Sequence, residues 1–145
     1  MTTNKIQDLT SIKTSEKYAT RAGRITHAKM QSVFYPDGDQ DLIKQISTNP
    51  ELIEIMGPLS KTEVPIAGFI NGKFISRRID RLYINHDAKK IVVLDYKTDT
   101  DKNLFKQKYN EQLNEYRQLL KQIYNNYSVT TKILWLNDFT LENII

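Results

Sequence analysis

The sequence contains no cysteine among its 145 residues, which excludes disulfide scaffolds, thiolate zinc sites, iron–sulfur clusters and thiol nucleophiles. It contains no apolar run longer than five residues, so it lacks a segment of the length that a membrane-spanning helix needs. The stretch from Met1 to Lys5 has none of the apolar character of a secretory signal. These absences favour a protein of the reducing cytoplasm without a membrane partner.

Glycine and proline are scarce, with five and four residues, and no Gly/Ser-rich linker, repeat or low-complexity stretch divides the chain. The sequence therefore predicts a single domain over residues 1–145. Hydrophobic residues make up 39% and charged residues 26%, which is typical of a globular domain. Lysine and arginine outnumber aspartate and glutamate by 21 to 17, and this net charge of +4 indicates a polyanionic partner without establishing one.

Helix signals dominate the first part of the chain. Residues 16–35 have a helical apolar pattern that ends at the breaker Pro36-Asp37-Gly38. The apolar positions of this helix are Ile25, Ala28, Met30 and Val33. Two short helices follow, one over 39–46 with an acidic start and one from Asn49-Pro50 to Gly57-Pro58, where asparagine is the N-cap and proline the first helical residue.

The middle of the chain changes to a strand pattern. Residues 62–70 and 73–84 flank Asn71-Gly72, the favoured pair for a type I′ turn, and predict a β-hairpin. The run 91–94, Ile-Val-Val-Leu, is continuously apolar and rich in β-branched residues. This composition indicates a strand that is buried on both faces and lies centrally in the sheet.

The last part predicts a long amphipathic helix and a further strand. Residues 103–124 contain no glycine or proline, and apolar residues recur there at spacings of three and four. They are Phe105, Tyr109, Tyr116, Leu119, Leu120 and Ile123. Residues 129–136 form an apolar strand. The predicted fold class is α/β, with helices flanking a mixed central sheet in the order α-β-β-β-α-β and extra N-terminal helices.

Charged residues interrupt two of the apolar strands. Asp80 lies inside the second hairpin strand, and Asp95 and Lys97 lie at the end of the central strand. The strand period of two places Asp95 and Lys97 on one face and Tyr96 on the other. If the two strands pair, two carboxylates and an ammonium converge, and a cation such as Mg²⁺ would relieve their repulsion. Metal and Lys97 would then activate water and stabilise a phosphoryl transition state.

The same residues also have a purely structural interpretation. Asp95 and Lys97 could form a strand-end salt bridge, and Asp80 could pair with Arg78 or Arg81 on a half-exposed hairpin. Spacing alone favours this interpretation, because short motifs are weak predictors of chemistry.

Two polar residues on the predicted helices have open roles. Gln112 lies on the apolar stripe of the helix over 103–124, where an unpaired amide would cost about 1–3 kcal/mol. It therefore needs a partner, which is either a backbone carbonyl or a substrate. His27, judged from its surroundings alone, is more often a structural histidine than a metal ligand.

Five stretches of the sequence, taken in order, resemble the nuclease domain at the C-terminus of AddA-type and RecB-type helicase-nucleases, within the PD-(D/E)XK superfamily. The likeness is greatest to the AddA type, and it covers about 120 residues. The matching stretches are Arg21-Ala-Gly-Arg-Ile-Thr-His27, Glu63-Val-Pro-Ile-Ala-Gly68, Ile79-Asp80-Arg81-Leu82, Val93-Leu-Asp95-Tyr-Lys97-Thr98 and Tyr109-Asn-Glu-Gln112-Leu-Asn-Glu-Tyr116, with Ile133-Leu134-Trp135 near the end.

The resemblance implies a restriction-endonuclease-like core and phosphodiester hydrolysis that depends on Mg²⁺ or Mn²⁺. It implies catalytic roles and metal ligation for specific residues. Asp80, Asp95, Lys97, Gln112 and Tyr116 would be catalytic, and His27, Asp80, Asp95 and the backbone carbonyl of Tyr96 would bind the metal. The role of Glu63, which also matches a family position, stays open.

The resemblance further implies a nucleic-acid substrate, with single-stranded DNA as the default and RNA left open because no 2′-hydroxyl contact is identifiable. The family usually carries this domain behind a helicase motor, whereas this chain has no Gly-x-x-x-x-Gly-Lys-Ser/Thr motif, so a helicase would be a separate partner or part of a larger gene product. It also has Arg77 where the family often has glycine. The alternative function is a non-catalytic nucleic-acid-binding or helicase-docking remnant of the same fold.

Overall fold

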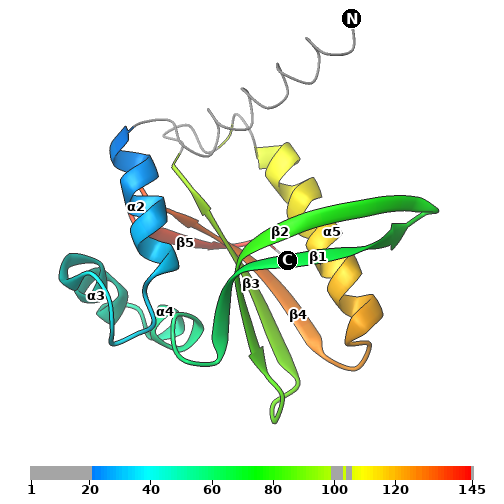
Figure 1. The fold of residues 1–145 in the computed structure, drawn as a ribbon, viewed down its shortest axis with the longest axis horizontal. Coiled ribbons are helices and arrows are strands. Elements are labelled where there is room, and N and C mark those ends of the chain that lie inside the picture. Colours follow the sequence, from blue (N-terminus) through cyan, green and yellow to red (C-terminus); the bar gives the residue numbers. More distant parts are fainter. Residues whose placement is uncertain (1–20, 99–102, 104–105, 145) are drawn as a thin grey trace, which may run out of the picture.

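The computed structural model describes residues 21–98, 103 and 106–144. Four helices and five strands lie in these residues, and helix numbering begins at α2 (Figure 1). The helices are α2 (Arg21–Gln31), α3 (Gln40–Ser47), α4 (Pro50–Ile55) and α5 (Lys106–Ile123). The strands are β1 (Ser60–Ile70), β2 (Lys73–Asn85), β3 (Lys90–Lys97), β4 (Ser128–Trp135) and β5 (Thr140–Asn143).

A mixed sheet with the strand order β1-β2-β3-β4-β5 organises the fold. Strands β3 and β4 are parallel, and α5 connects them, whereas the other three pairs are antiparallel. Strand β3 is the middle strand and is buried along nearly its whole length. The prediction of a central strand in a mixed α/β fold is therefore confirmed.

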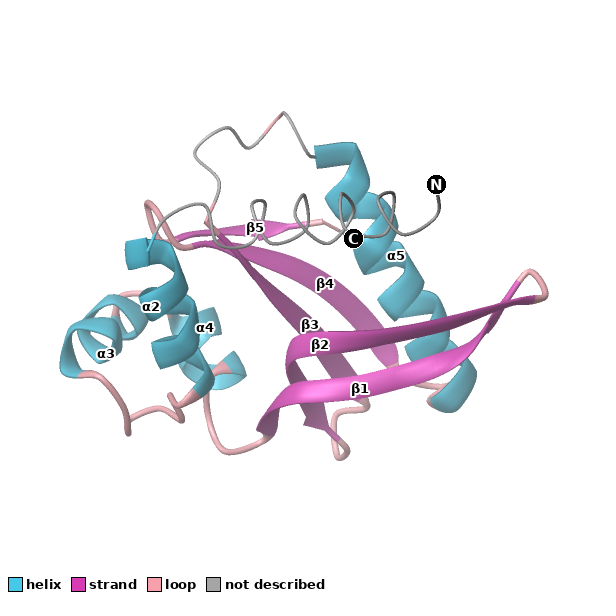
Figure 2. Cartoon of the chain, turned by 45° about the horizontal axis from the view of Figure 1, so that its top comes forward, coloured by secondary structure: helices cyan, strands magenta, loops and turns pink. Residues whose placement is uncertain are grey.

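Helices cover both faces of the sheet (Figure 2). On one face, α5 contributes Leu113, Leu119 and Leu120 to a core with Ile79 and Val93 of the sheet. On the other face, α2, α3 and α4 pack on the sheet through a second core. The helical part of that core consists of Met30, Leu42, Ile46, Leu52 and Ile55. The end of β3 therefore lies between α5 and α2.

The local signals at the turns act as the sequence predicts. Asp39 caps α3 by accepting hydrogen bonds from two backbone amides, and Asn49 caps α4 in the same way with Pro50 at the first helical position. Asn71 and Gly72 have φ values of 51° and 77°, the left-handed geometry that a type I′ turn requires. The hairpin and the two short helices are confirmed.

Three predicted details are wrong. The first helix ends at Gln31 rather than at residue 35, because the amide of Phe34 donates to the carbonyl of Asp37 instead of continuing the helix. The carbonyls of Met30 and Val33 also accept hydrogen bonds from a buried arginine. Ala28 is exposed, since α2 turns other residues towards the sheet. Ile123, the last residue of α5, is 59% exposed and lies outside the core that buries the rest of the apolar stripe.

The sequence prediction also missed β5. This edge strand has only four residues, Thr-Leu-Glu-Asn, and none of them is buried, so no apolar run marks it. The proposed start of the first helix at residues 16–20, the side chain of Ile25 and Phe105 lie outside what the structure describes. Among the described helices, none is both long enough and apolar enough to span a membrane.

Candidate active site

Antiparallel pairing of β2 with β3 brings the two aspartates together. The register joins Arg81 to Leu94, so Asp80 lies next to Asp95 on the neighbouring strand. The backbone amide of Tyr96 donates a 2.9 Å hydrogen bond to Asp80 Oδ2. Both carboxylates are buried, with exposures of 1% and 0%. The convergence that depended on this strand pairing is present in the structure.

The ammonium of Lys97 lies on the same face of β3 as Asp95. Lys97 Nζ is 2.7 Å from Asp95 Oδ2, and it donates a 3.2 Å hydrogen bond to Gln112 Oε1. It also lies 4.1 Å from the ring centroid of Tyr109, within the range of a cation–π interaction. The strand-end salt bridge of the structural interpretation is thus formed, and two residues of α5 fix its lysine in position.

Helix α5 supplies a hydrogen-bonded chain to this ammonium. Gln112 Nε2 donates to the Tyr116 hydroxyl at 2.9 Å, and that hydroxyl donates to the backbone carbonyl of Arg78 at 3.2 Å. The spacing of four residues places Gln112 and Tyr116 on one side of the helix. Burial, reinforced by the charges of Asp95 and Asp80, raises the pKa of Tyr116, so its hydroxyl stays protonated. The partners of Gln112 are therefore side chains and not a backbone carbonyl.

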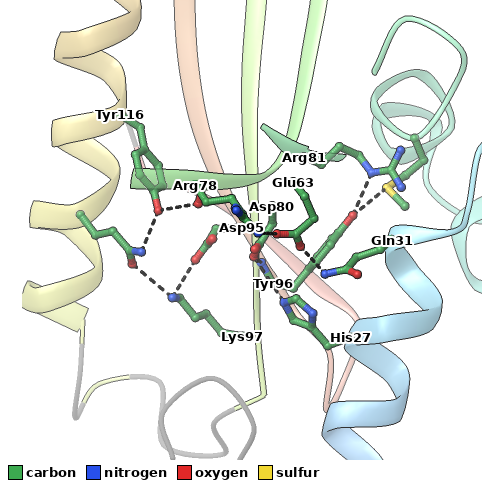
Figure 3. Close-up of polar contacts among 12 residues, drawn as sticks. His27, Gln31, Glu63, Arg78, Asp80, Arg81, Asp95, Tyr96, Lys97 and Tyr116 are labelled. Carbon is green, nitrogen blue, oxygen red and sulfur yellow. Dashed lines mark hydrogen bonds and ion pairs between the residues drawn. The ribbon is translucent and has the colours of Figure 1, made fainter. Parts of the chain in front are cut away.

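His27 of α2 reaches the Asp80 carboxylate. Its Nε2 atom lies 3.5 Å from Asp80 Oδ2, and both side chains are almost completely buried. Its ring packs edge-on against Tyr96, with centroids 5.4 Å apart and planes at 85°. Figure 3 shows Lys97 approaching the aspartates from the α5 side and His27 from the α2 side. The structure therefore brings all the predicted side chains of the site together.

Arg81 has a role that the sequence did not reveal. Its guanidinium is buried and makes four hydrogen bonds of 2.6 to 2.8 Å. The acceptors are the Tyr96 hydroxyl, Ser60 Oγ and the backbone carbonyls of Met30 and Val33. Arg81 therefore joins the C-terminal end of α2 to the sheet, and α2 is the helix that carries His27. The guanidinium that the structural interpretation would pair with Asp80 is thus directed to these four acceptors.

Arg81 also stabilises the hydroxyl of Tyr96. Burial raises the pKa of Tyr96 to about 12, and the nearby Arg81 only partly opposes this effect. The neutral hydroxyl accepts a hydrogen bond from Arg81 and donates one to Met56 Sδ at 3.7 Å. The side chain of Tyr96 thus lies on the α2 face of the sheet, and its backbone amide donates a hydrogen bond to Asp80. Metal binding by its carbonyl stays a prediction.

Glu63 lies on β1, opposite Asp80 of the neighbouring strand β2. The neighbouring pairs, Thr62 with Arg81 and Val64 with Ile79, give this register, and Glu63 itself has a left-handed φ of 52°. Its carboxylate accepts a hydrogen bond from Gln31 of α2 and lies 3.9 Å from an Arg78 nitrogen. Glu63 is therefore a second link between the hairpin and α2, which the sequence left without a role.

The groups at this point that could contribute to binding a divalent cation belong to Asp80, Asp95 and His27. Two carboxylates and one imidazole are available, and Mg²⁺ or Mn²⁺ commonly binds through one or two carboxylates while it keeps several waters. Within residues 21–98, 103 and 106–144, no three His, Asp or Glu side chains form a ready cluster for a metal. The Asp95 carboxylate is turned towards Lys97, with which it forms an ion pair.

His27 gives the first test of this donor set. If His27 binds the cation, substituting His27→Ala should weaken Mn²⁺ binding by at least the roughly 10- to 100-fold that the loss of an outer-shell partner costs, because a direct ligand is removed. Calorimetric titration of both proteins with Mn²⁺ measures the effect. Unchanged affinity in the variant would make His27 a structural residue.

Comparisons with known proteins neither add to these roles nor contradict them. No protein-family model matches the chain, and no curated protein matches it either. The assignment of roles therefore depends on geometry and on the chemistry of the side chains.

The sequence did contain a signal for the role of Arg81. Its guanidinium lies inside an apolar strand, and a buried guanidinium must find several hydrogen-bond acceptors.

Proposed function

We propose that this chain is a metal-dependent nuclease domain with a PD-(D/E)XK core. The order of α2, three strands, α5 and β4 is compatible with that core, and α3 and α4 are the extra helices. The sheet is mixed and has helices on both faces. The motifs that resemble the family lie on elements of the expected type, since Asp80 and Asp95 are on strands and Gln112 is on a helix.

The observation that carries the proposal is the meeting of four separate elements at one buried point. Strands β2 and β3 each provide an aspartate, α2 provides His27, and α5 provides the amide that holds Lys97. Burying two carboxylates side by side is costly unless positive charge compensates them. A structural salt bridge would need only one of these carboxylates. The full set fits metal-assisted phosphoryl chemistry better.

In this mechanism, Asp80, Asp95 and His27 would hold Mg²⁺ or Mn²⁺ close to the end of β3. When bound, the cation neutralises charge on the phosphate and lowers the pKa of water. Lys97 keeps an ammonium beside the phosphate, where it donates a hydrogen bond to the charge that develops in the transition state. Gln112 restricts the rotation of Lys97.

The proposed substrate is single-stranded DNA, with RNA as the competing substrate. A flexible single strand can bring one of its phosphodiesters into a site between α2 and α5 more readily than a stiff duplex can. Binding through a few lysine and arginine contacts to phosphates should be weak and should fall steeply with salt. We therefore propose a distributive, ATP-independent nuclease that a separate helicase motor could supply with strands.

Purified protein incubated with matched linear and circular single-stranded DNA, and with linear RNA, tests this function. We expect cleavage with Mg²⁺ or Mn²⁺, none with EDTA, and none with the isosteric variant Asp80→Asn. Circular DNA should also be cut, because nothing in the proposed mechanism requires an end. Cleavage that resists both EDTA and Asp80→Asn would refute the proposal, and protein that binds strands but never cuts them would identify the non-catalytic alternative.

A further inference from the structure

The β1–β2 hairpin has one face packed on α5 and one face open. Gly68 belongs to the packed face, since a Cβ atom there would lie 2.9 Å from Leu119 Cδ2. Ile75 belongs to the same face and to the core formed with α5. Successive residues of a strand alternate between faces, so Phe69 and Phe74 point away from α5. Their exposed fractions are 62% and 59%.

The two phenylalanines form a pair at the projecting end of the hairpin. They are cross-strand partners next to the Asn71-Gly72 turn, with ring centroids 5.4 Å apart and planes at 66°. The hairpin tip reaches beyond α5 in both overall views (Figures 1 and 2). Solvent therefore meets two large aromatic surfaces that contribute little to either core of the domain.

The open face leads from this pair to the candidate active site. From the tip inwards, the exposed cross-strand pairs are Ala67 with Ser76 and Pro65 with Arg78. The next position of the register places Glu63 across from Asp80, and the Glu63 carboxylate lies 3.9 Å from Arg78 of this face. Phe74 and Asp80 are six positions apart, which is about 20 Å along a strand.

The charge of the hairpin suits a polyanion. Residues 60–79 contain four basic residues and one acidic residue, which gives a net charge of +3. The basic residues are Lys61, Lys73, Arg77 and Arg78. Arg77 turns to Glu115 of α5, and strand alternation puts Lys73 on that same side, so Arg78 is the exposed cation that lies on the open face. Exposed aromatic rings combined with cations along one track are typical of surfaces that bind single-stranded nucleic acid.

We propose that the open face of the hairpin binds the single strand that extends from the active site, with Phe69 and Phe74 stacking on its bases. The inference rests on the proposed function, which places the cleaved phosphate beside Asp80 and Asp95. A span of about 20 Å corresponds to on the order of six nucleotides at the stacked spacing of about 3.4 Å, and to fewer when the strand is extended. The stacking pair therefore distinguishes long substrates from short ones.

A protein partner fits this face less well. Between the aromatic pair and the active site, the face carries alanine, serine, proline and arginine, so it offers a narrow track and not a broad apolar patch. Protein interfaces usually have a buried apolar centre with a polar rim. The Phe pair lies instead at one end of a narrow track that leads past Arg78.

Binding without cleavage tests the platform independently of catalysis. In buffer with EDTA, a fluorescent oligothymidylate of about fifteen nucleotides is titrated with wild type and with the double variant Phe69→Leu/Phe74→Leu. Leucine keeps the apolar surface but removes the aromatic faces, so Kd should rise about tenfold or more. The matched control is Leu59→Ala, an exposed apolar residue at the opposite end of β1, which should leave Kd unchanged. The variant Phe74→Trp should bind as wild type, with its fluorescence quenched by the bound strand.

Cleavage of short and long substrates gives the second readout. The double variant should raise KM for the long strand and leave kcat unchanged, and it should cut a substrate of about three nucleotides as wild type does, because that substrate cannot reach the tip. Wild-type affinity for the strand in the double variant would overturn the platform. It would also be overturned if the double substitution abolished self-association of the protein and left strand binding unchanged. Weakened binding in a protein that never cleaves would support the platform and refute the nuclease.

Discussion

Substituting Lys97→Met should lower the rate of phosphodiester cleavage about 100- to 1000-fold, the loss typical of removing one donor that stabilises transition-state charge. Methionine keeps the length of the side chain but has no charge, so the developing charge on the phosphate loses its partner. Gln112 and Tyr109 hold the ammonium in place, and their positions need not change. Single-turnover cleavage of labelled single-stranded DNA with saturating Mn²⁺ measures the effect.

Two further variants separate catalysis from folding. The loss of Lys97 leaves Asp95 as a buried charge without its 2.7 Å partner, which itself destabilises the fold. Lys97→Arg keeps the charge but replaces the compact ammonium with a planar guanidinium, so it should fold normally and still lose most of the activity. Lys90→Met, at the start of the same strand and partly exposed, should keep the wild-type rate. Equal rates for Lys97→Arg, Lys97→Met and wild type would exclude a catalytic role for the lysine.

Substituting Arg81→Met should lower the free energy of unfolding by about 3–5 kcal/mol, the largest stability loss expected for a single change here. The variant leaves four buried acceptors without their donor, and each buried group that loses its hydrogen bond costs about 1–3 kcal/mol before the structure relaxes. Urea unfolding followed by circular dichroism measures the change. The result should be a lower midpoint with a similar slope.

Arg78→Met is the matched control, because this arginine is three positions earlier on β2 and its side chain is exposed with one long contact to Glu63. It should change stability by less than about 0.5 kcal/mol. Arg81→Lys should fall between the two, since one ammonium cannot reach all the acceptors that the guanidinium joins. If Arg81→Met is as stable as Arg78→Met, the hydrogen bonds of Arg81 do not anchor α2 to the sheet. They would then not be what holds His27, which lies on α2, in place.

The elements of the fold that could be predicted are those that local chemistry determines. Asn71-Gly72 specifies its turn because both residues adopt left-handed geometry, and Asn49-Pro50 begins α4 because the asparagine caps free amides. The apolar run of β3 indicates a central strand because both of its faces are covered. Strand β5 could not be found, since its exposed polar sequence gains its order from pairing with β4.

The candidate site divides in the same way. Period-two alternation correctly put Asp95 and Lys97 on one face, which a single strand is enough to show. The end of α2 and the acceptors of Arg81 depend on contacts between residues about 50 positions apart, and no local pattern encodes them. The left-handed backbone of Glu63 likewise arises where the hairpin meets α2, so the role of this residue emerges only in the folded chain.

An anomalous diffraction map, collected at the manganese absorption edge from crystals of the protein grown with Mn²⁺, tests the metal site directly. We predict one strong peak or two neighbouring peaks bordered by the carboxylates of Asp80 and Asp95, with His27 Nε2 as a ligand. The same map from Asp80→Asn crystals should lose this density. Wild-type crystals with manganese bound elsewhere and no density between these carboxylates would contradict the proposed catalytic metal centre.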